Sequence, residues 1–234
     1  MAHRSGRHFL QIPGPTNVPD RILRAMDRPT IDHRGPEFAA LGREVLAGIK
    51  TIFRTEQPVV IYPASGTGAW EAAIVNTLSP GDKVLMFETG HFATLWRNLA
   101  ERFGIQCDFV PGDWRRGVDP DTVEARLSED REHTIKAVMV VHNETSTGVA
   151  SRIPLVRRAI DRTGHPALLL VAPISSLASI DYRHDEWGVD VTVSGSQKGL
   201  MLPPGLSFNA VSEKALAASR ANRMPRSYWD WAEM

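Results

Sequence analysis

The stretch DVTVSGSQKGL (residues 190–200) joins a short apolar run to a lysine that is set among small residues. Nearly continuous apolar runs rich in β-branched residues are typical of strands that are buried on both faces of a sheet. A lysine just after such a strand is partly desolvated, which lowers the pKa of its amine and allows a Schiff base with a carbonyl compound. Lys198 is therefore a candidate catalytic residue, and a solvated lysine in a surface loop is the alternative.

Similar apolar runs recur along the chain and alternate with amphipathic stretches. Strands are predicted at residues 59–62, 83–87, 106–110, 137–141, 167–171, 190–193 and 206–211. Helices are predicted at residues 20–26, 36–53, 67–78, 92–103, 120–127 and 154–163. This alternation predicts an α/β fold with a mainly parallel seven-stranded sheet.

Composition and charge narrow the class of protein. Lys+Arg and Asp+Glu both number 27 in 234 residues, so no overall basic balance points to nucleic acid or to an anionic membrane. No apolar run approaches the roughly 20 residues of a membrane span. The single cysteine, Cys107, excludes an intrachain disulfide and is predicted to be a buried thiol. We expect a soluble cytoplasmic protein without a metal site.

The stretch PASGTG (residues 63–68) lies between a predicted strand and a predicted helix. Its glycines let backbone N–H groups approach an anion, and the start of a helix favours negative charge. It lacks the lysine of a P-loop and the complete glycine pattern of a dinucleotide fingerprint. Ser65, Gly66 and Thr67 are candidate phosphate ligands, and a plain capped turn is the alternative.

The two features together point to one cofactor. A phosphate loop after an early strand and a lysine after a late strand suit a phosphorylated aldehyde, and pyridoxal 5'-phosphate is such a molecule. In sheets of this kind, ligands bind outside the carboxyl ends of the strands.

Further motifs carry a family resemblance. The segment SGSQKG (194–199) resembles the Schiff-base motif of class V aminotransferases, which are fold-type I pyridoxal-phosphate enzymes. Matching segments are SGT (65–67), GHF (90–92), HNETSTG (142–148), GPTNVP (14–19) and HRGPEF (33–38), so the resemblance spans essentially the whole chain. The serine–glyoxylate or alanine–glyoxylate branch is the most similar.

The resemblance implies a role for each matching residue. Lys198 would hold the cofactor, Phe92 would stack on its ring, and Thr145 would hydrogen-bond it. A core aromatic and a simple turn are the alternatives for Phe92 and for the 142–148 loop. The implied phosphate ligands are Ser65, Gly66, Thr67 and Gln197, and Pro15 and Thr16 would lie near the substrate.

Two departures from the family stand out. The family has an aspartate, paired with the pyridinium nitrogen, at the end of the fifth predicted strand, where this chain has Ala172 followed by Pro173. Family members are also longer, and we expect their small C-terminal domain to be missing from this chain. We therefore expect an N-terminal arm (1–20) and a three-layer, fold-type I large domain (21–234) that is truncated at its C-terminal end. The aromatic segment RMPRSYWDW (223–231) is then expected to leave apolar surface uncovered.

The implied activity is transamination between serine, or alanine, and glyoxylate, which gives glycine and hydroxypyruvate, or pyruvate. The implied partners are an amino acid, a 2-oxo acid and a second copy of the chain in a homodimer. Truncation and Ala172 are expected to impair activity. One alternative is a catalytically inactive fragment, and another is a different class V enzyme. A desulfurase-like lyase is disfavoured because Gln197 stands where a histidine would, and Cys107 lies in a predicted strand.

Overall fold

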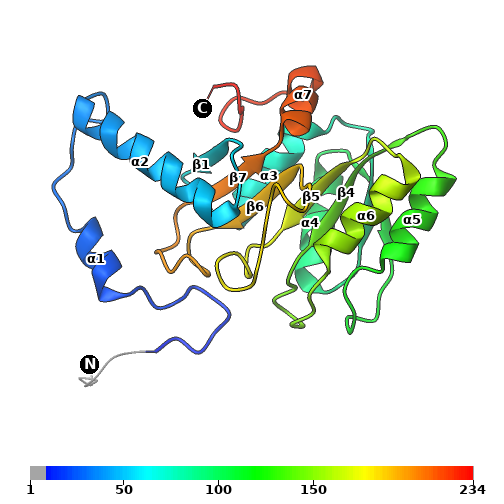
Figure 1. Cartoon of the computed structure of the whole chain (residues 1–234), viewed down its shortest axis with the longest axis horizontal. Helices are drawn as coiled ribbons and strands as arrows, with labels where there is room; N and C mark the ends of the chain where they lie inside the picture. Colours follow the sequence, from blue (N-terminus) through cyan, green and yellow to red (C-terminus); the bar gives the residue numbers. More distant parts are fainter. Residues whose placement is uncertain (1–8, 234) are drawn as a thin grey trace.

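A seven-stranded sheet forms the centre of the molecule in the computed structural model, which describes residues 9–233 (Figure 1). The strand order is β1-β7-β6-β5-β4-β2-β3. Strands β2 to β6 are parallel to one another, whereas β7 is antiparallel to both of its neighbours, β6 and β1. The bounds are β1 Val59–Tyr62, β2 Lys83–Phe87, β3 Gln106–Val110, β4 Ile135–Val141, β5 Leu168–Ala172, β6 Val191–Gly195 and β7 Ser207–Val211.

The predicted mainly parallel sheet is confirmed, with small shifts at strand ends. Strand β4 begins two residues earlier than predicted because Ile135 is buried and pairs with Lys83 of β2. Strand β5 extends one residue further than predicted because Ala172 pairs with Val141 of β4. The end of β5 therefore lies directly beside the end of β4.

The described residues also form seven helices. They are α1 Asp20–Met26, α2 Pro36–Phe53, α3 Gly66–Thr77, α4 His91–Arg102, α5 Pro120–Glu129, α6 Ile153–Thr163 and α7 Glu213–Ala221. Helix α7 was not predicted from the sequence. Its signal was an N-cap serine before an alanine-rich run: the Ser212 side chain accepts a hydrogen bond from the amide of Ala215.

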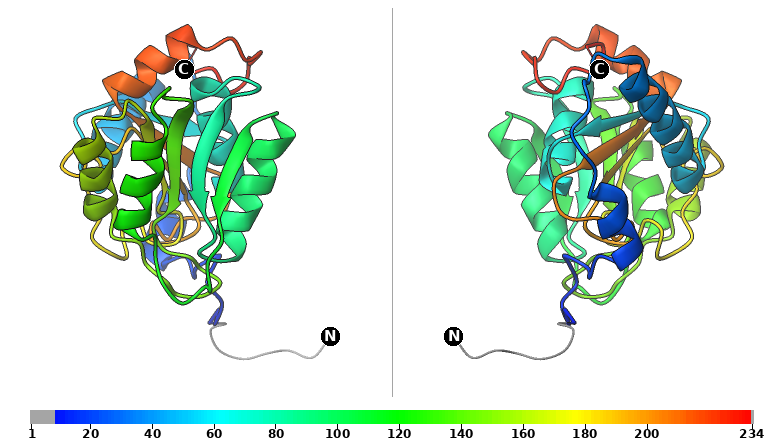
Figure 2. Two further views of the ribbon diagram at one scale, coloured as in Figure 1. Left: turned by 90° about the vertical axis from the view of Figure 1, so that its right-hand side faces the viewer. Right: turned by 90° about the vertical axis from the view of Figure 1, so that its left-hand side faces the viewer.

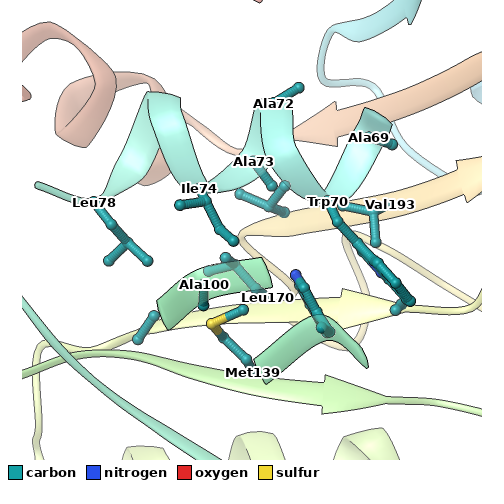
Figure 3. Packing of buried hydrophobic residues seen from close by; sticks show 14 of the residues in the cluster. Ala69, Trp70, Ala72, Ala73, Ile74, Leu78, Ala100, Met139, Leu170 and Val193 are labelled. Atoms are coloured by element: carbon teal, nitrogen blue, oxygen red, sulfur yellow. The ribbon is translucent and has the colours of Figure 1, made fainter. Parts of the chain in front are cut away.

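Helices cover both faces of the sheet, which gives the predicted three layers (Figure 2). Helices α3, α4 and α7 pack on one face, and α5, α6 and the end of α2 pack on the other. Figure 3 shows Trp70 and Ile74 of α3 packed near Met139 and Leu170 of the sheet. Neighbouring residues of a strand alternate between the faces, so Leu170 joins this layer and Leu169 joins the opposite one.

The two tryptophans of the aromatic segment near the C-terminus are packed, which corrects the expectation that they leave apolar surface uncovered, whereas Tyr228 of the same segment is exposed. Trp231 is buried in the core layer of α3. Trp229 packs edge-on against Tyr62 at 5.1 Å between ring centroids, and its carbonyl oxygen accepts a 2.6 Å hydrogen bond from the amide of Asn76. The segment turns back over α3 and covers that helix itself.

The N-terminal elements lie at one end of the molecule and are loosely packed (Figure 1). None of the residues of α1 is buried, and α2 buries only Ile49 and Phe53. The boundary predicted at residues 20 and 21 stays a prediction, and residues 1–8 of that arm lie outside the described residues.

Cys107 in edge strand β3 is only half-buried, less than predicted.

No helix in the part of the chain that the structure describes is long and apolar enough to cross a membrane.

Candidate functional site

A cavity of about 140 Å³ lies at the carboxyl ends of β1, β4, β5 and β6. Its place agrees with the expectation for ligands of parallel sheets. All seven residues predicted to contact the cofactor line it: Ser65, Gly66, Thr67, Phe92, Thr145, Gln197 and Lys198. The fold therefore brings together residues that are up to 133 positions apart in the sequence (Ser65 and Lys198, 198 − 65).

The predicted phosphate loop forms the start of α3. Ser65 occupies the N-cap position, but its side chain makes no capping hydrogen bond, so its hydroxyl is free for another partner. The first amides of a helix also have no partner within the helix, and they carry partial positive charge. A Cβ atom on Gly66 would lie 2.6 Å from Ile174, and one on Gly195 would lie 3.2 Å from the amide nitrogen of Gly66. Both glycines thus permit the close packing that forms this end of the cavity.

Lys198 follows β6 and is the charged side chain of the cavity. Its amine donates a 3.3 Å hydrogen bond to the carbonyl oxygen of Pro13. Burial lowers the pKa of Lys198 below its ordinary value. Beside it, the side-chain oxygen of Gln197 is buried and has no hydrogen-bond partner within the protein. An unsatisfied buried polar atom in a cavity is expected to meet a ligand or water.

Pro15 and Thr16 belong to a strap that crosses the lysine loop. The amide of Thr16 donates to the carbonyl oxygen of Gln197 at 3.0 Å, and its hydroxyl donates to that of Lys198 at 3.1 Å. The polar groups of Thr16 thus hold the strap on the lysine loop, while Pro15 is exposed. Their predicted role in substrate binding stays a prediction.

The HNETSTG loop points its side chains in opposite directions. Asn143 and Thr145 line the cavity. His142 instead faces away, where its Nδ1 lies 2.9 Å from the hydroxyl of Ser176 and its ring contacts Tyr182 and Trp187. Burial lowers the pKa of His142 to about 4, so this histidine is neutral at pH 7. It is a packed structural residue.

The remaining walls are largely apolar. Phe92, Trp70 and Val141 line the cavity, and so does Ala172 at the end of β5, where the resembled family has an aspartate. Lys198 is the only charged residue among the described residues that line the cavity. Five lining residues were not predicted from the sequence: Trp70, Val141, Asn143, Ile174 and Ser175. Asn143 stood within a quoted motif, and the other four lie in α3, at the end of β4 or just after β5.

Most of this site fits pyridoxal phosphate. The uncapped start of α3 and the free Ser65 hydroxyl suit a phosphate, and the Lys198 amine suits an aldehyde. The apolar walls suit the face of an aromatic ring. A ring nitrogen beside Ala172 would have no acidic partner there, because this side chain provides neither a charge nor a hydrogen-bond acceptor.

Comparisons with known proteins give a consistent picture. The family model described as aminotransferase class-V matches residues 8–223. The chain is 49% identical to the L-aspartate–glyoxylate aminotransferase of Paracoccus denitrificans, with 95% of this chain and 57% of that protein aligned. It is 48% identical to the serine–glyoxylate aminotransferase of Methylorubrum extorquens, with 98% and 59% aligned.

A solved structure extends the likeness to three dimensions. The alanine–glyoxylate aminotransferase of Nostoc sp. superposes with a TM-score of 0.90 at 30% identity, and the match covers 100% of this chain and 61% of that one. The chain thus spans less than two thirds of the length of the curated relatives that it matches.

Proposed function

Since this chain belongs to the aminotransferase class-V family, whose members depend on pyridoxal phosphate, we propose that it binds this cofactor and transfers an amino group from serine, or alanine, to glyoxylate. The products would be glycine and hydroxypyruvate, or pyruvate. The observation that carries the proposal is the shared cavity, where the Lys198 amine and the uncapped start of α3 both face inward. We also propose that it acts in the cytoplasm, because its single cysteine, Cys107, cannot form an intrachain disulfide.

When bound, pyridoxal phosphate supplies a carbonyl carbon for an amine and a ring that accepts electrons from the substrate's α-carbon. Lys198 would hold the carbonyl carbon, and its Nζ would then move the α-proton as general base and acid. The lowered pKa of Lys198 favours this, because more of the amine is free to act as a nucleophile. Ser65, Gly66, Thr67 and Gln197 would bind the phosphate, Phe92 would cover the ring, and Thr145 would hydrogen-bond it.

Glyoxylate appears in the names of all three proteins described above. Their names give aspartate, serine and alanine as amino donors, with glyoxylate in each case. We therefore propose glyoxylate as acceptor and serine or alanine as donor, with aspartate as a further candidate donor.

A second candidate function rests on one specific observation. Ala172 leaves the ring nitrogen without an acidic partner in an otherwise apolar surrounding. Without that partner the ring accepts electrons poorly, so the chain would bind the cofactor but catalyse slowly or not at all. A desulfurase-like activity is disfavoured, because Cys107 lies in edge strand β3 and Gln197 precedes the lysine.

We also propose that the chain forms a homodimer. Helix α2 exposes Phe38, Leu41 and Val45, which recur at intervals of three and four residues and so share one face. An exposed apolar face of this kind is typical of a protein–protein contact.

Cofactor attachment is tested by labelling. The chain is incubated with pyridoxal phosphate, reduced with borohydride and mapped by peptide mass spectrometry. We expect the pyridoxyl group on Lys198 and its loss in Lys198→Ala. Lys214→Ala is the matched control, because burial lowers the pKa of Lys214 too, yet its amine is bound to the Ala167 carbonyl oxygen at 2.8 Å. Label spread evenly over several lysines would contradict the proposal. Formation of glycine from serine and glyoxylate then distinguishes an active enzyme from an inactive cofactor-binding fold.

A further inference from the structure

The carboxylate of Glu144 connects two walls of the cofactor cavity without lining it. We propose that Glu144 is a positioning residue that fixes the start of α4, and with it Phe92, against the loop that carries Asn143 and Thr145. This inference rests on the proposed cofactor site and assigns a residue that the site needs although it contacts no ligand.

The hydrogen bonds of Glu144 reach both elements. Oε1 accepts from the amide of Phe92 at 3.2 Å, and Oε2 accepts from the amide of Ala93 at 3.1 Å. Oε1 also accepts from the hydroxyl of Ser146 at 2.8 Å and from its amide at 3.2 Å. The Ser146 hydroxyl in turn accepts from the amide of His91 at 3.0 Å. The first turn of α4 is thus joined to residues 144–146 by one hydrogen-bonded group.

Burial makes this contact strong. Glu144 is fully buried, and a carboxylate removed from water must be compensated by hydrogen bonds or opposite charge. Here the partners are amides and a hydroxyl at the start of α4, where the helix dipole also favours a negative charge. The N-cap position of α4 is Gly90, which has no side chain to cap the helix. Glu144, which lies outside α4, therefore caps the start of this helix.

The backbone around Gly90 is adapted to this carboxylate. A Cβ atom on Gly90 would lie 2.4 Å from Cγ of Glu144 and 2.7 Å from the Ser146 hydroxyl. These separations are shorter than van der Waals contact, so only glycine lets the carboxylate reach the α4 amides.

Glu144 affects the shape of the cavity through residues that are its hydrogen-bond partners or its neighbours in the sequence. Phe92, whose amide binds Glu144, lines the cavity, and so do Asn143 and Thr145 on either side of Glu144. If the carboxylate is lost, the start of α4 and the loop can separate, and the ring-binding walls lose their spacing. None of these hydrogen bonds reaches the start of α3. Loss of the Glu144 carboxylate should therefore leave the proposed phosphate site intact.

The test compares Glu144→Gln with a control substitution at another carboxylate that accepts hydrogen bonds from backbone amides. Glutamine keeps the shape of Glu144 but turns an N–H₂ group toward amide donors. Asp130→Asn is the control: Asp130 accepts from the amides of Thr134 and Ile135 and from the Thr134 hydroxyl, away from the cavity, and it also pairs with Nε2 of His165 at 3.2 Å. Ser146→Ala is a milder second variant, which removes one donor and retains the carboxylate.

Pyridoxal phosphate is titrated into each protein. The dissociation constant is measured by tryptophan fluorescence, and the visible circular dichroism of the bound cofactor reports its fixed orientation. Unfolding temperatures without cofactor report general stability.

We expect Glu144→Gln to raise the dissociation constant at least about tenfold and to weaken the dichroism per bound cofactor. Ser146→Ala should also raise the dissociation constant and weaken the dichroism, but by less. Asp130→Asn should lower the unfolding temperature and leave the dissociation constant and the dichroism unchanged. Unchanged binding and dichroism in Glu144→Gln, or equal losses in Asp130→Asn, would overturn the inference. Absence of cofactor binding by the parent chain would instead refute the proposed function, and the inference with it.

Discussion

The amine of Lys198 lies 3.3 Å from the carbonyl oxygen of Pro13, so the N-terminal strap contacts the one charged group of the cavity. Gly14 makes this approach possible. Its φ of +142° is rarely adopted by other residues, and a Cβ atom there would lie 2.5 Å from Nζ of Lys198. The strap therefore depends on the absence of a side chain at this position.

Gly14→Ala should displace either the strap or the lysine. The overlap and the unusual φ are expected to lower the free energy of unfolding by about 1–3 kcal/mol. Borohydride labelling of Lys198 by pyridoxal phosphate should fall as well. Gly42→Ala is the matched control, since a Cβ atom there meets no atom within 4 Å in exposed helix α2, and it should stabilise by up to about 1 kcal/mol. Equal labelling in Gly14→Ala and the parent would show that the strap does not set the position of the amine.

The strands and the phosphate loop could be predicted because their signals are local. Buried strands of a parallel sheet read as short apolar runs, and glycines before a helix mark an anion loop. The position of Glu144 could not be predicted this way, because its partners in α4 lie more than 50 residues away and the acid shows no helix-capping pattern of its own. The packing of Trp229 against Tyr62 is equally non-local, which is why the aromatic segment was expected to be exposed.

Acid should destabilise the protein through two buried neutral histidines. Burial lowers the pKa of His142 and of His184 from 6.5 to about 4. The unfolded chain binds these protons at a higher pH than the folded one, so their contribution to stability is complete above pH 6.5 and is lost as the pH falls toward 4. Between pH 7 and pH 5 each should reduce the free energy of unfolding by up to about 2 kcal/mol.

Urea unfolding of His142→Phe at the two pH values checks this. The variant retains a ring beside Tyr182 and Trp187 but has no proton to gain, so its loss of stability between pH 7 and pH 5 should be smaller than that of the parent. His33→Gln, at an exposed site, should show the parent's pH dependence. If His142→Phe also keeps the parent's slope, the buried histidine is not the group that titrates.

The exposed face of α2 should control self-association if the proposed homodimer forms. Leu41→Glu together with Val45→Glu places two charges on that face. Burial of each apolar side chain contributes about 1.5–3 kcal/mol, so the dissociation constant of the dimer should rise at least about a hundredfold. Sedimentation velocity measures it, with Leu95→Glu on the exposed side of α4 as control. A parent chain that stays monomeric at high concentration would contradict the proposed homodimer.

Ala172 should limit catalysis even where the cofactor binds. Its side chain is buried at the end of β5, and Pro173, which follows it, has no backbone N–H to offer the ring. A carboxylate here would keep the ring nitrogen protonated through a charge-assisted hydrogen bond of about 1.5–3 kcal/mol. Because about 1.36 kcal/mol in a barrier is tenfold in rate, the missing acid should slow removal of the α-proton at least about ten- to a hundredfold.

Replacing Ala172→Asp and Pro173→Thr together should therefore accelerate exchange of the serine α-proton in deuterium oxide by that factor. The chemical shift of ¹⁵N in the ring of labelled pyridoxal phosphate gives a second readout, because it should change from the neutral to the protonated range. Ala172→Asn with Pro173→Thr is the matched control, since asparagine has nearly the same volume as aspartate but carries no charge. The control should leave the ring nitrogen neutral and the exchange slow, which separates the effect of charge from that of filling the cavity. Equal exchange rates in the parent and the aspartate variant would mean that another group protonates the ring, and that Ala172 is not the source of the impairment.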